Sequence, residues 1–489
     1  MKNNRALKLC AIAFAVYLVL GFAFYFLAGD SLFRTSDIEM GVSGTDTTDE
    51  LIQGSVIEQP FYCEFDALDA VLVSVDTANR TNTGSIYAEI LDAEGTVLRQ
   101  ATLNTAVMSS TELCEIAFDP IENAKDKKFV LRLTGVDGTT GNAVSFLYGN
   151  TINAGRGSVE EKIEKDMALK VDGVEIADNE SKFCALAIDV RGFEEHIFGT
   201  YYWLFYAGGA LLLAAYLLSV YLRYRKGKTP YVVGVIKSLQ KYGFLIRQLV
   251  ARDFKTKYKR SVLGILWSFL NPLLTMSVQY VVFSYLFKSD IENFVVYLLT
   301  GIVCYNFFHE ATNMCLMSII GNAPLISKVY VPKYIYPFSR SLSSGINMLF
   351  SLVPLLICLF ITRTPITPAL LLLPFGLIML FLLSYGVGLL LATMMVFFRD
   401  TQFLWGIMTM LLMYLTPIFY PETIIPEQFL TVYKLNPLYH ILRFMRSILI
   451  DGVSLEPKAY LYCAILCIIP FLIGVLVFRK NEDKFVLNI

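Results

Sequence analysis

An uncharged apolar run that ends at two closely spaced prolines constrains this chain more than any other sequence feature. Residues 403–419 contain no charge, so they are long enough to cross the roughly 30 Å hydrocarbon core of a bilayer as a helix. Pro417 and Pro421 end that helix, because proline removes a backbone donor and opposes helical continuation. Phe419 and Tyr420 are aromatic residues typical of a membrane–water boundary. The pattern indicates a membrane conduit with a shaped mouth rather than a plain anchor.

Composition and charge divide the chain. Of its 489 residues, 55% are hydrophobic and 17% charged, which is typical of an integral membrane protein. Residues 29–197 hold 31 of the 42 acidic and 13 of the 41 basic residues, a balance of −18, and the remainder carries +17. The sequence therefore predicts an acidic soluble block inserted into a basic membrane protein.

The sequence lacks the common motifs for nucleotide binding, hydrolysis and metal binding. A P-loop, a nucleophile elbow and an HExxH motif are all missing from the sequence, so we expect a chain that is not an enzyme and binds no cofactor itself. No Cys/His spacing predicts a metal site. The acidic block holds Cys63, Cys114 and Cys184, which permit one disulfide without requiring it.

Two apolar segments flank the acidic block. Residues 9–28 follow three basic residues and resemble a signal anchor, with a cleaved signal as the alternative. Residues 197–222 form a second span, after which residues 223–260 contain twelve bases and one acid, Asp253. The positive-inside rule places this basic segment in the cytoplasm and the acidic block outside the membrane.

The acidic block has a strand-like pattern. Short β-branched or alternating runs are separated by turn residues, which predicts an all-β sandwich or jelly roll, and residues 41–50 have the composition of a linker. The predicted strands are residues 70–75, 85–91, 96–103, 129–134, 144–148 and 185–190.

Six further spans follow, so the predicted fold is an α-helical polytopic membrane protein of about eight transmembrane helices with an inserted extracellular β domain. Both termini are then cytoplasmic. The six spans are expected at residues 262–287, 292–315, 341–362, 369–397, 402–420 and 459–478. The predicted domains are residues 1–29, 30–196, 197–222, 223–260 and 261–489, the last with an extracellular re-entrant segment at 421–458.

Two amphipathic segments face opposite sides of this membrane. Residues 246–259 alternate apolar and basic positions at helical spacing, which favours a helix at the inner surface, although a cluster that only orients the chain is an alternative. Residues 437–450 predict a short helix dipping into the outer surface, where Arg443 and Arg446 bind anions or reach for lipid phosphates. The predicted outer gate comprises Pro417, Phe419, Tyr420, Pro421, His440 and Arg443.

Four blocks carry a family resemblance. The first runs from Arg252-Asp253 through residues 258–267 to Asn271-Pro272, and the second joins residues 306–308 to residues 322–332. Phe398-Arg399-Asp400 is the third, and residues 416–421 with Asn436-Pro437 are the fourth. In this order they resemble type 2 ABC exporter permeases for polysaccharides such as O-antigen and teichoic acid, over residues 245–489.

The resemblance implies a six-span permease half that forms a homodimer and is driven by two copies of a separate ATPase, which bind the ATP and Mg. It implies a cytoplasmic ATPase-coupling loop and an interfacial gate helix that meets a glycan on a polyprenyl pyrophosphate carrier. The coupling residues are Asn322, Leu325, Lys328, Tyr330, Pro332, Lys333 and Arg340, and the phosphate contacts are Arg252, Lys255, Lys257, Lys259 and Arg260. One departure is Tyr334 after Lys333, where the family has an acidic residue.

Aromatic residues recur in the predicted spans and suit a conduit for sugar rings, although helix packing or lipid contact is the alternative for each one. The conduit candidates are Tyr280, Tyr297, Tyr305, Phe307 and Phe308. The acidic domain would bind emerging glycan, cap the conduit or act as a solvated spacer. Its charge favours a neutral or amino-sugar glycan, because a polyanion would be repelled.

The sequence therefore predicts the permease of an ABC exporter for lipid-linked surface polysaccharide in a bacterial cytoplasmic membrane, with no nucleic-acid partner. One alternative is an exporter of a small lipid or drug. Another is a membrane-anchored extracellular glycan-binding or sensor protein, which would work without an ATPase. The identity of the glycan, its length control and the ligand of the outer domain lie beyond the sequence.

Overall fold

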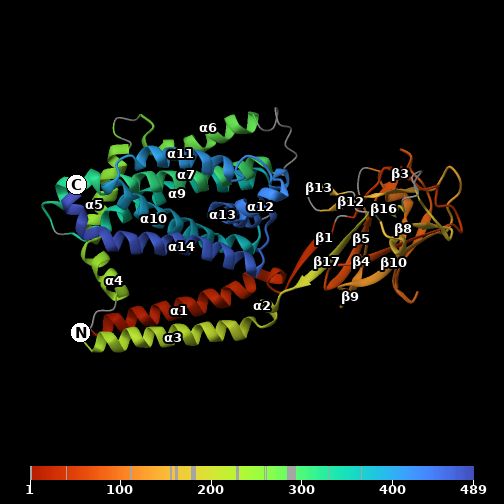
Figure 1. The fold of residues 1–489 in the computed structure, drawn as a ribbon, viewed down its shortest axis with the longest axis horizontal. Helices are drawn as coiled ribbons and strands as arrows, with labels where there is room; N and C mark the ends of the chain where they lie inside the picture. The colour runs from red at the N-terminus through yellow and green to blue at the C-terminus, as the bar shows by residue number, and fades with distance from the viewer. Residues whose placement is uncertain are drawn as a thin grey trace. The chain divides into compact units, whose positions relative to one another are not determined.

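The computed structural model forms two compact units, a helical unit (Met1–Leu32 and Phe198–Ile489) and a β unit (Phe33–Ile197). It describes residues 3–39, 41–110, 113–154, 157–159, 163–177, 183–226, 231–257, 259, 262–282, 293–329, 331–364 and 366–488. Figure 1 shows the helices of the first unit and the strands of the second.

The β unit is built from antiparallel strand pairs. A six-stranded sheet has the order β15-β14-β4-β10-β7-β8, and a four-stranded sheet has the order β1-β17-β5-β9. Smaller sheets have the orders β16-β11-β3, with β6 beside β11, and β13-β12-β2. The strands are β1 (Arg34–Glu39), β2 (Val42–Ser43), β3 (Asp46–Thr47), β4 (Val56–Cys63), β5 (Ala67–Val73), β6 (Val75–Asp76), β7 (Ser85–Asp92), β8 (Val97–Asn104), β9 (Cys114–Glu122), β10 (Lys127–Gly135), β11 (Ser145–Gly149), β12 (Thr151–Ala154), β13 (Gly157–Val159), β14 (Lys170–Val171), β15 (Val174–Glu175), β16 (Ala185–Leu186) and β17 (Ile188–Glu195).

Side-chain alternation explains the core of the β unit. In β10, Phe129, Leu131 and Leu133 are buried while their neighbours face outward, as the two-residue period of a strand requires. The N-terminal β region is present as predicted, and its sandwich form stays a prediction. The linker prediction for residues 41–50 was wrong, because β2 and β3 lie there. These two-residue strands pair with β12 and β11, partners distant in sequence that local composition does not reveal.

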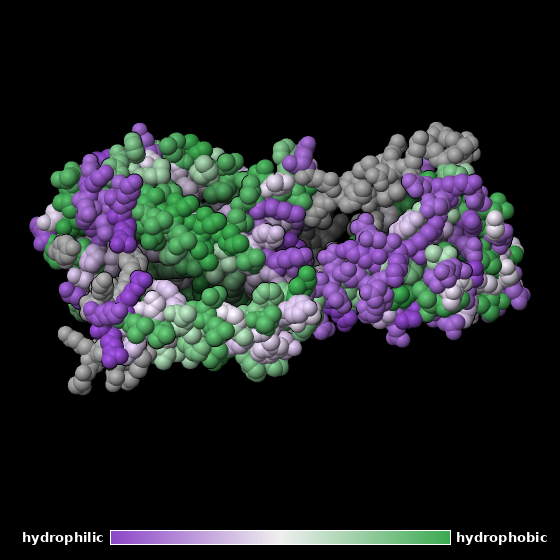
Figure 2. All heavy atoms as spheres, turned by 60° about the horizontal axis from the view of Figure 1, so that its bottom comes forward, coloured by the Kyte–Doolittle hydropathy of each residue, from purple (hydrophilic) through white to green (hydrophobic). Residues whose placement is uncertain are grey.

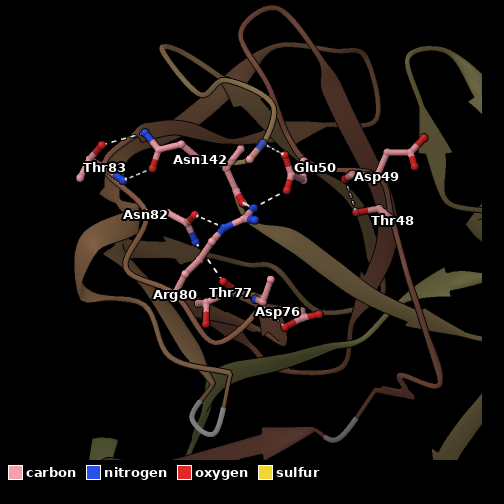
Figure 3. Close-up of polar contacts among 12 residues, drawn as sticks. Thr48, Asp49, Glu50, Asp76, Thr77, Arg80, Asn82, Thr83 and Asn142 are labelled. Atoms are coloured by element: carbon pink, nitrogen blue, oxygen red, sulfur yellow. Dashed lines mark hydrogen bonds and ion pairs between the residues drawn. The ribbon is translucent and has the colours of Figure 1, made fainter.

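One arginine fastens three loops of the β unit, as Figure 3 shows. Arg80 donates to the Glu50 carboxylate, to Asn82 Oδ1 at 2.9 Å and to the Ala143 carbonyl at 3.1 Å. The other oxygen of Glu50 accepts the Gly141 amide at 2.6 Å. Hydrogen bonds from Arg80 and Gly141 hold the pKa of Glu50 below its usual value. The three loops are therefore cross-linked at one carboxylate.

The helical unit has α7, α9, α10 and α14 at its centre, with α1 beside α3 (Figure 1). Its largest hydrophobic cluster draws on α7, α9, α10, α13 and α14. The helices are α1 (Asn3–Ala28), α2 (Ile197–Thr200), α3 (Tyr202–Arg225), α4 (Tyr231–Lys241), α5 (Gly243–Lys257), α6 (Trp267–Val281), α7 (Phe294–Leu316), α8 (Ala323–Ile326), α9 (Ile335–Ile361), α10 (Leu373–Phe397), α11 (Thr401–Leu415), α12 (Glu427–Lys434), α13 (Pro437–Arg446), α14 (Pro457–Asn481) and α15 (Phe485–Asn488).

Six helices of the described chain are long and apolar enough to cross a membrane. They correspond to α1, α3, α7, α9, α10 and α14 and match six of the eight expected spans. The other two expected spans correspond to α6 and α11, each of 15 residues in the structure. Figure 2 shows a broad hydrophobic surface on the helical unit and a mainly hydrophilic one on the β unit. A helical membrane region is therefore confirmed, and the count of eight stays a prediction.

Candidate functional site

Helix α5 is amphipathic and packs by one face into the helical unit. Ile246, Leu249 and Val250 are buried in a cluster that includes Tyr336 of α9 and Phe485 of α15. In Figure 1, α5 lies at the end of the helical unit where both chain termini are found. The basic side chains of the predicted phosphate-contact set remain on the outside: Arg252, Lys255, Lys257 and Lys259 are all exposed. Arg260, the fifth of that set, lies outside the described residues.

A buried carboxylate joins α5 to α9. The Asp253 side chain is 3% exposed, and its Oδ1 lies 2.8 Å from Arg340 Nη1 and 3.5 Å from Arg252 Nη2. Burial raises the pKa of Asp253, and the charges of Arg340 and Arg252 oppose that shift. Arg252 also donates to Asn322 Oδ1 at 3.1 Å. A single polar chain thus connects α5, α9 and the segment that leads into α8.

A second polar contact joins α5 to the span helices. Lys257 Nζ lies 2.8 Å from Glu310 Oε1 in α7, and Asn347 of α9 donates to the same oxygen at 2.8 Å. Lys257 is therefore engaged within the helical unit, whereas Lys255 and Lys259 extend from its surface. Glu310 thus joins three helices, α5, α7 and α9.

The predicted coupling residues divide into an exposed and a tethered group. Lys328 is exposed, and a cavity of about 180 Å³ lies beside α8, lined by Pro324, Ser327 and Val486 among others. Lys333 instead donates to the Glu482 carbonyl, and Arg340 is bound to Asp253. The structure also places Asn322 in the interior, Leu325 half-buried against the α5 cluster and Pro332 partly exposed, while Tyr330 lies outside the described residues.

At α13 the chain enters the hydrophobic cluster of the helical unit. Asn436 caps this helix by accepting the Leu438 amide, and Pro437 occupies its first turn, where a missing amide is tolerated. Leu438, Ile441 and Met445 are almost completely buried. The helix is therefore packed among α7, α10 and α14, and a π-helical turn (Ser447–Asp451) follows it.

Arg446 holds the bend after α11. Its side chain donates to the Pro417 carbonyl at 2.6 Å and to the Ile418 carbonyl at 3.1 Å, and its guanidinium carbon lies 3.3 Å from the ring centroid of Tyr297. The expectation that Arg446 reaches for external anions was wrong, because the residue is only 9% exposed. Its hydrogen-bond partners lie after α11, and its ring partner lies in α7. The pattern of residues 437–450 alone therefore could not reveal these contacts.

The remaining outer-gate residues lie close to this bend. Tyr297 donates to the Tyr420 carbonyl at 2.7 Å, and Phe419 is buried in the core. His440 contacts the Lys434 carbonyl at 2.7 Å, while Arg443 is exposed. The structure thus brings Pro417, Tyr420 and Tyr297 together with Arg446.

The conduit candidates are mostly interior residues of the single chain. Tyr305, Phe307 and Phe308 are 3–9% exposed and belong to the hydrophobic cluster. Tyr305 donates to the Thr409 carbonyl, which binds α7 to α11. Tyr280 and Tyr297 are half-buried, with ring contacts to Phe294. The structure does not bring these five residues to one open surface of the chain.

Two important contacts were not predicted, the ion pair of Asp253 with Arg340 and the binding of Arg446 to the bend after α11. Asp253 follows Leu249 and Val250 at a spacing of three to four residues, which places a carboxylate on the apolar face of a basic helix. That position signals a buried cation partner, although not which one. The sequence gives no comparable sign that Arg446 is buried, because its hydrogen-bond acceptors are backbone carbonyls.

These features define a polytopic membrane protein, with an amphipathic basic helix at one end and a helix packed into the bundle toward the other. A family model described as ABC-2 type transporter matches residues 245–450. The chain belongs to this family, whose members are transporter subunits without an ATPase domain of their own. Membership implies a separate partner ATPase subunit, and the matched residues lie in the helical unit.

Similar proteins are export permeases. The chain is 31% identical to the O-antigen export system permease protein RfbA of Klebsiella pneumoniae, over 51% of this chain and 98% of the relative. It is 25% identical to the polysialic acid transport protein KpsM of Escherichia coli, over 49% of this chain and 93% of the relative. It is also 25% identical to the capsule polysaccharide export inner-membrane protein CtrC of Neisseria meningitidis, over 43% of this chain and 84% of the relative.

Proposed function

We propose that this chain is the membrane permease of a polysaccharide exporter in a bacterial inner membrane, that it works as a homodimer with two ATPase subunits, and that its cargo is a lipid-linked glycan. The names of its relatives support the polysaccharide class. The lipid-linked form of the cargo is supported by the chemistry of α5.

The observation that carries the proposal is the division of α5 into two faces. One face is fixed by apolar packing and by the Asp253–Arg340 ion pair. The other presents Arg252 and Lys255 at the surface, and Lys259 is exposed two residues after the helix ends. A pyrophosphate offers several anionic oxygens, and such cations bind them by charge-assisted hydrogen bonds. An anchored helix with exposed cations therefore suits a headgroup that arrives from the inner membrane surface.

The same helix is positioned to respond to an ATPase. The exposed segment around α8 and Lys328 is the proposed contact, and Asn322 at its start accepts a hydrogen bond from Arg252 of α5. Pro324 and Pro332 restrict the backbone of this segment, so a displacement would be transmitted rather than absorbed. Movement at the ATPase contact would thus reach the helix that meets the cargo.

The wider arrangement is part of the proposal. We place the β unit outside the cell as a sandwich domain that meets the emerging glycan, between the first two of eight spans. Its excess of acidic residues favours neutral or amino-sugar glycans. The bend at Pro417 and Pro421, with α13, forms the outer gate. The conduit aromatics would act from within each chain by shaping the helices that line the path.

Depletion of this protein tests the proposal. Lipid-linked glycan should accumulate on the cytoplasmic side while surface polysaccharide declines, and re-expression should reverse both. The matched control is expression of the chain with a partner ATPase that cannot hydrolyse ATP, which should not restore export. A depleted strain with no intracellular glycan and unchanged surface polysaccharide would refute the proposal.

A further inference from the structure

A cavity of about 280 Å³ lies beside Arg446 in the helical unit. Its wall includes the rings of Tyr297 and Tyr439, the arginines Arg443 and Arg446, and Ser447. The carboxylates of Glu422 and Asp451 complete the polar lining. The lining combines two rings with several donors and acceptors, as is usual for small-molecule sites.

Arg446 is the feature of this cavity that structural packing explains least. It is nine-tenths buried, and its Nε has no hydrogen-bond partner among the described residues. Its Nη atoms donate to backbone carbonyl groups. Among the described residues, no carboxylate is hydrogen-bonded to this buried cation. A buried guanidinium with an unused donor is costly unless a further polar group approaches it.

The charges of the lining limit the ligand. The lining holds two arginines, Arg443 and Arg446, and two carboxylates, Glu422 and Asp451, so its formal charges sum to zero. The cavity therefore attracts neither an anion nor a cation strongly. Carboxylates accept hydroxyl hydrogen bonds and guanidinium groups donate them. A neutral molecule with many hydroxyl groups satisfies both kinds of residue, and Pro417, Pro421 and Leu455 give the cavity an apolar wall for its carbon-bound hydrogens.

The size of the cavity limits the ligand further. Small-molecule sites commonly occupy roughly 300–1,000 Å³, and this cavity lies just below that range. We propose that the cavity is a binding site for one neutral pyranose ring of the exported polymer, held between the bend after α11 and the end of α13. The assignment of the sugar to the exported polymer rests on the proposed function. The choice of a neutral sugar as the ligand rests on the residues that line the cavity.

The test uses the purified full chain in lipid nanodiscs with the methyl glycosides of glucose, galactose, mannose and N-acetylglucosamine as probes. Saturation-transfer NMR should detect at least one of them, and glucuronate should bind more weakly. Glu422→Gln combined with Asp451→Asn should weaken binding about tenfold or more, because hydrogen bonds to charged groups are lost. Glu456→Gln, a nearby acid that does not line the cavity, is the matched control.

Thermal unfolding of each variant shows whether the fold is intact, so that only folded variants are compared. The assignment is overturned if no glycoside binds, if the double variant binds as well as the wild type, or if glucuronate binds more tightly than the neutral sugars. Depletion separates this result from the proposed function. Loss of export without glycoside binding removes only the cavity assignment, whereas glycoside binding with normal polysaccharide in depleted cells removes only the polymer as the source.

Discussion

The helical unit buries one charged side chain in α5 and another in α13, and it compensates them in different ways. Asp253 lies against two arginines, at 2.8 Å and 3.5 Å, so its charge is balanced by opposite charge. Arg446 is balanced by the Pro417 and Ile418 carbonyls and the Tyr297 ring, which are dipoles and a quadrupole. The first contact is an ion pair between helices, and the second is a clamp on a backbone bend.

The difference indicates which contact can change during transport. Arg252, one of the two partners of Asp253, is exposed and also bonded to Asn322, so this network can be rearranged from the proposed ATPase contact. The Arg446 clamp is enclosed, and breaking it would leave a cation and two carbonyls in a low-dielectric interior. We therefore expect the contacts of α5 to change more readily than those of the bend after α11.

The largest expected effect is at the clamp. Arg446→Gln should lower the free energy of unfolding by about 3 kcal/mol or more, because the Pro417 and Ile418 carbonyls lose their donors. Arg446→Lys should rescue little, since a single ammonium does not reproduce the planar fork. Thermal unfolding in detergent measures both.

Arg443→Gln provides the matched control for this experiment, because Arg443 precedes Arg446 by three residues and is exposed. It should alter the free energy of unfolding by no more than about 0.5 kcal/mol. Equal effects of the two glutamine variants would contradict the distinction between a clamp and a surface arginine.

A double-mutant cycle tests the Asp253–Arg340 ion pair, the other of the two compared contacts. Asp253→Asn and Arg340→Gln should each destabilise the protein, and the double variant should be less destabilised than their sum. The expected coupling energy is about 1–3 kcal/mol, as for residues in one ion-pair network. Additive single effects would mean that the α5–α9 ion pair contributes nothing, in which case apolar packing and the other polar contacts hold α5.

The exposed cations in α5 and just after it should affect export and not stability. Lys255→Gln with Lys259→Gln should reduce export about tenfold, through lost charge-assisted bonds to the cargo phosphate, with unchanged membrane insertion and unfolding. Arg252 is kept in this variant because it also binds Asn322. Arg247→Gln, an exposed base of the same helix outside the predicted set, is the control. Normal export in the double-lysine variant would remove the phosphate role.

The smallest expected effect concerns Glu50 in the β unit. Its pKa is lowered in the folded state, so its stabilising contribution is present above the unfolded value of about 4.3 and is lost as the pH falls through the lowered pKa. At neutral pH, Glu50→Gln should speed hydrogen exchange at the Gly141 amide, which Glu50 accepts. At low pH, exchange in the variant and the wild type should become similar. A difference that persists unchanged at low pH would contradict the assignment.

Sequence patterns predicted those elements whose determinants are local. The long apolar runs predicted the span helices, and alternation predicted β7, β8 and β10. The stripe of Ile246, Leu249 and Val250 predicted the buried face of α5. Strands β2 and β3 were missed because each consists of two residues held only by distant partners.

The site was predictable only in part, for the same reason. The exposed position of Lys255 follows from helical periodicity within α5, whereas Lys259 lies two residues after the end of that helix. The burial of Phe307 and Phe308 does not, since all faces of an apolar span look alike until its neighbours are placed.

The sequence by itself determined a basic membrane region, an inserted acidic β region, and a proline-ended bend after an uncharged run, because charge, hydropathy and proline act over short stretches of chain. Only the tertiary structure decided that Asp253 meets Arg340 and that Arg446 closes on the bend at Pro417. Both contacts join segments far apart in the chain, and their geometry depends on how the helices pack.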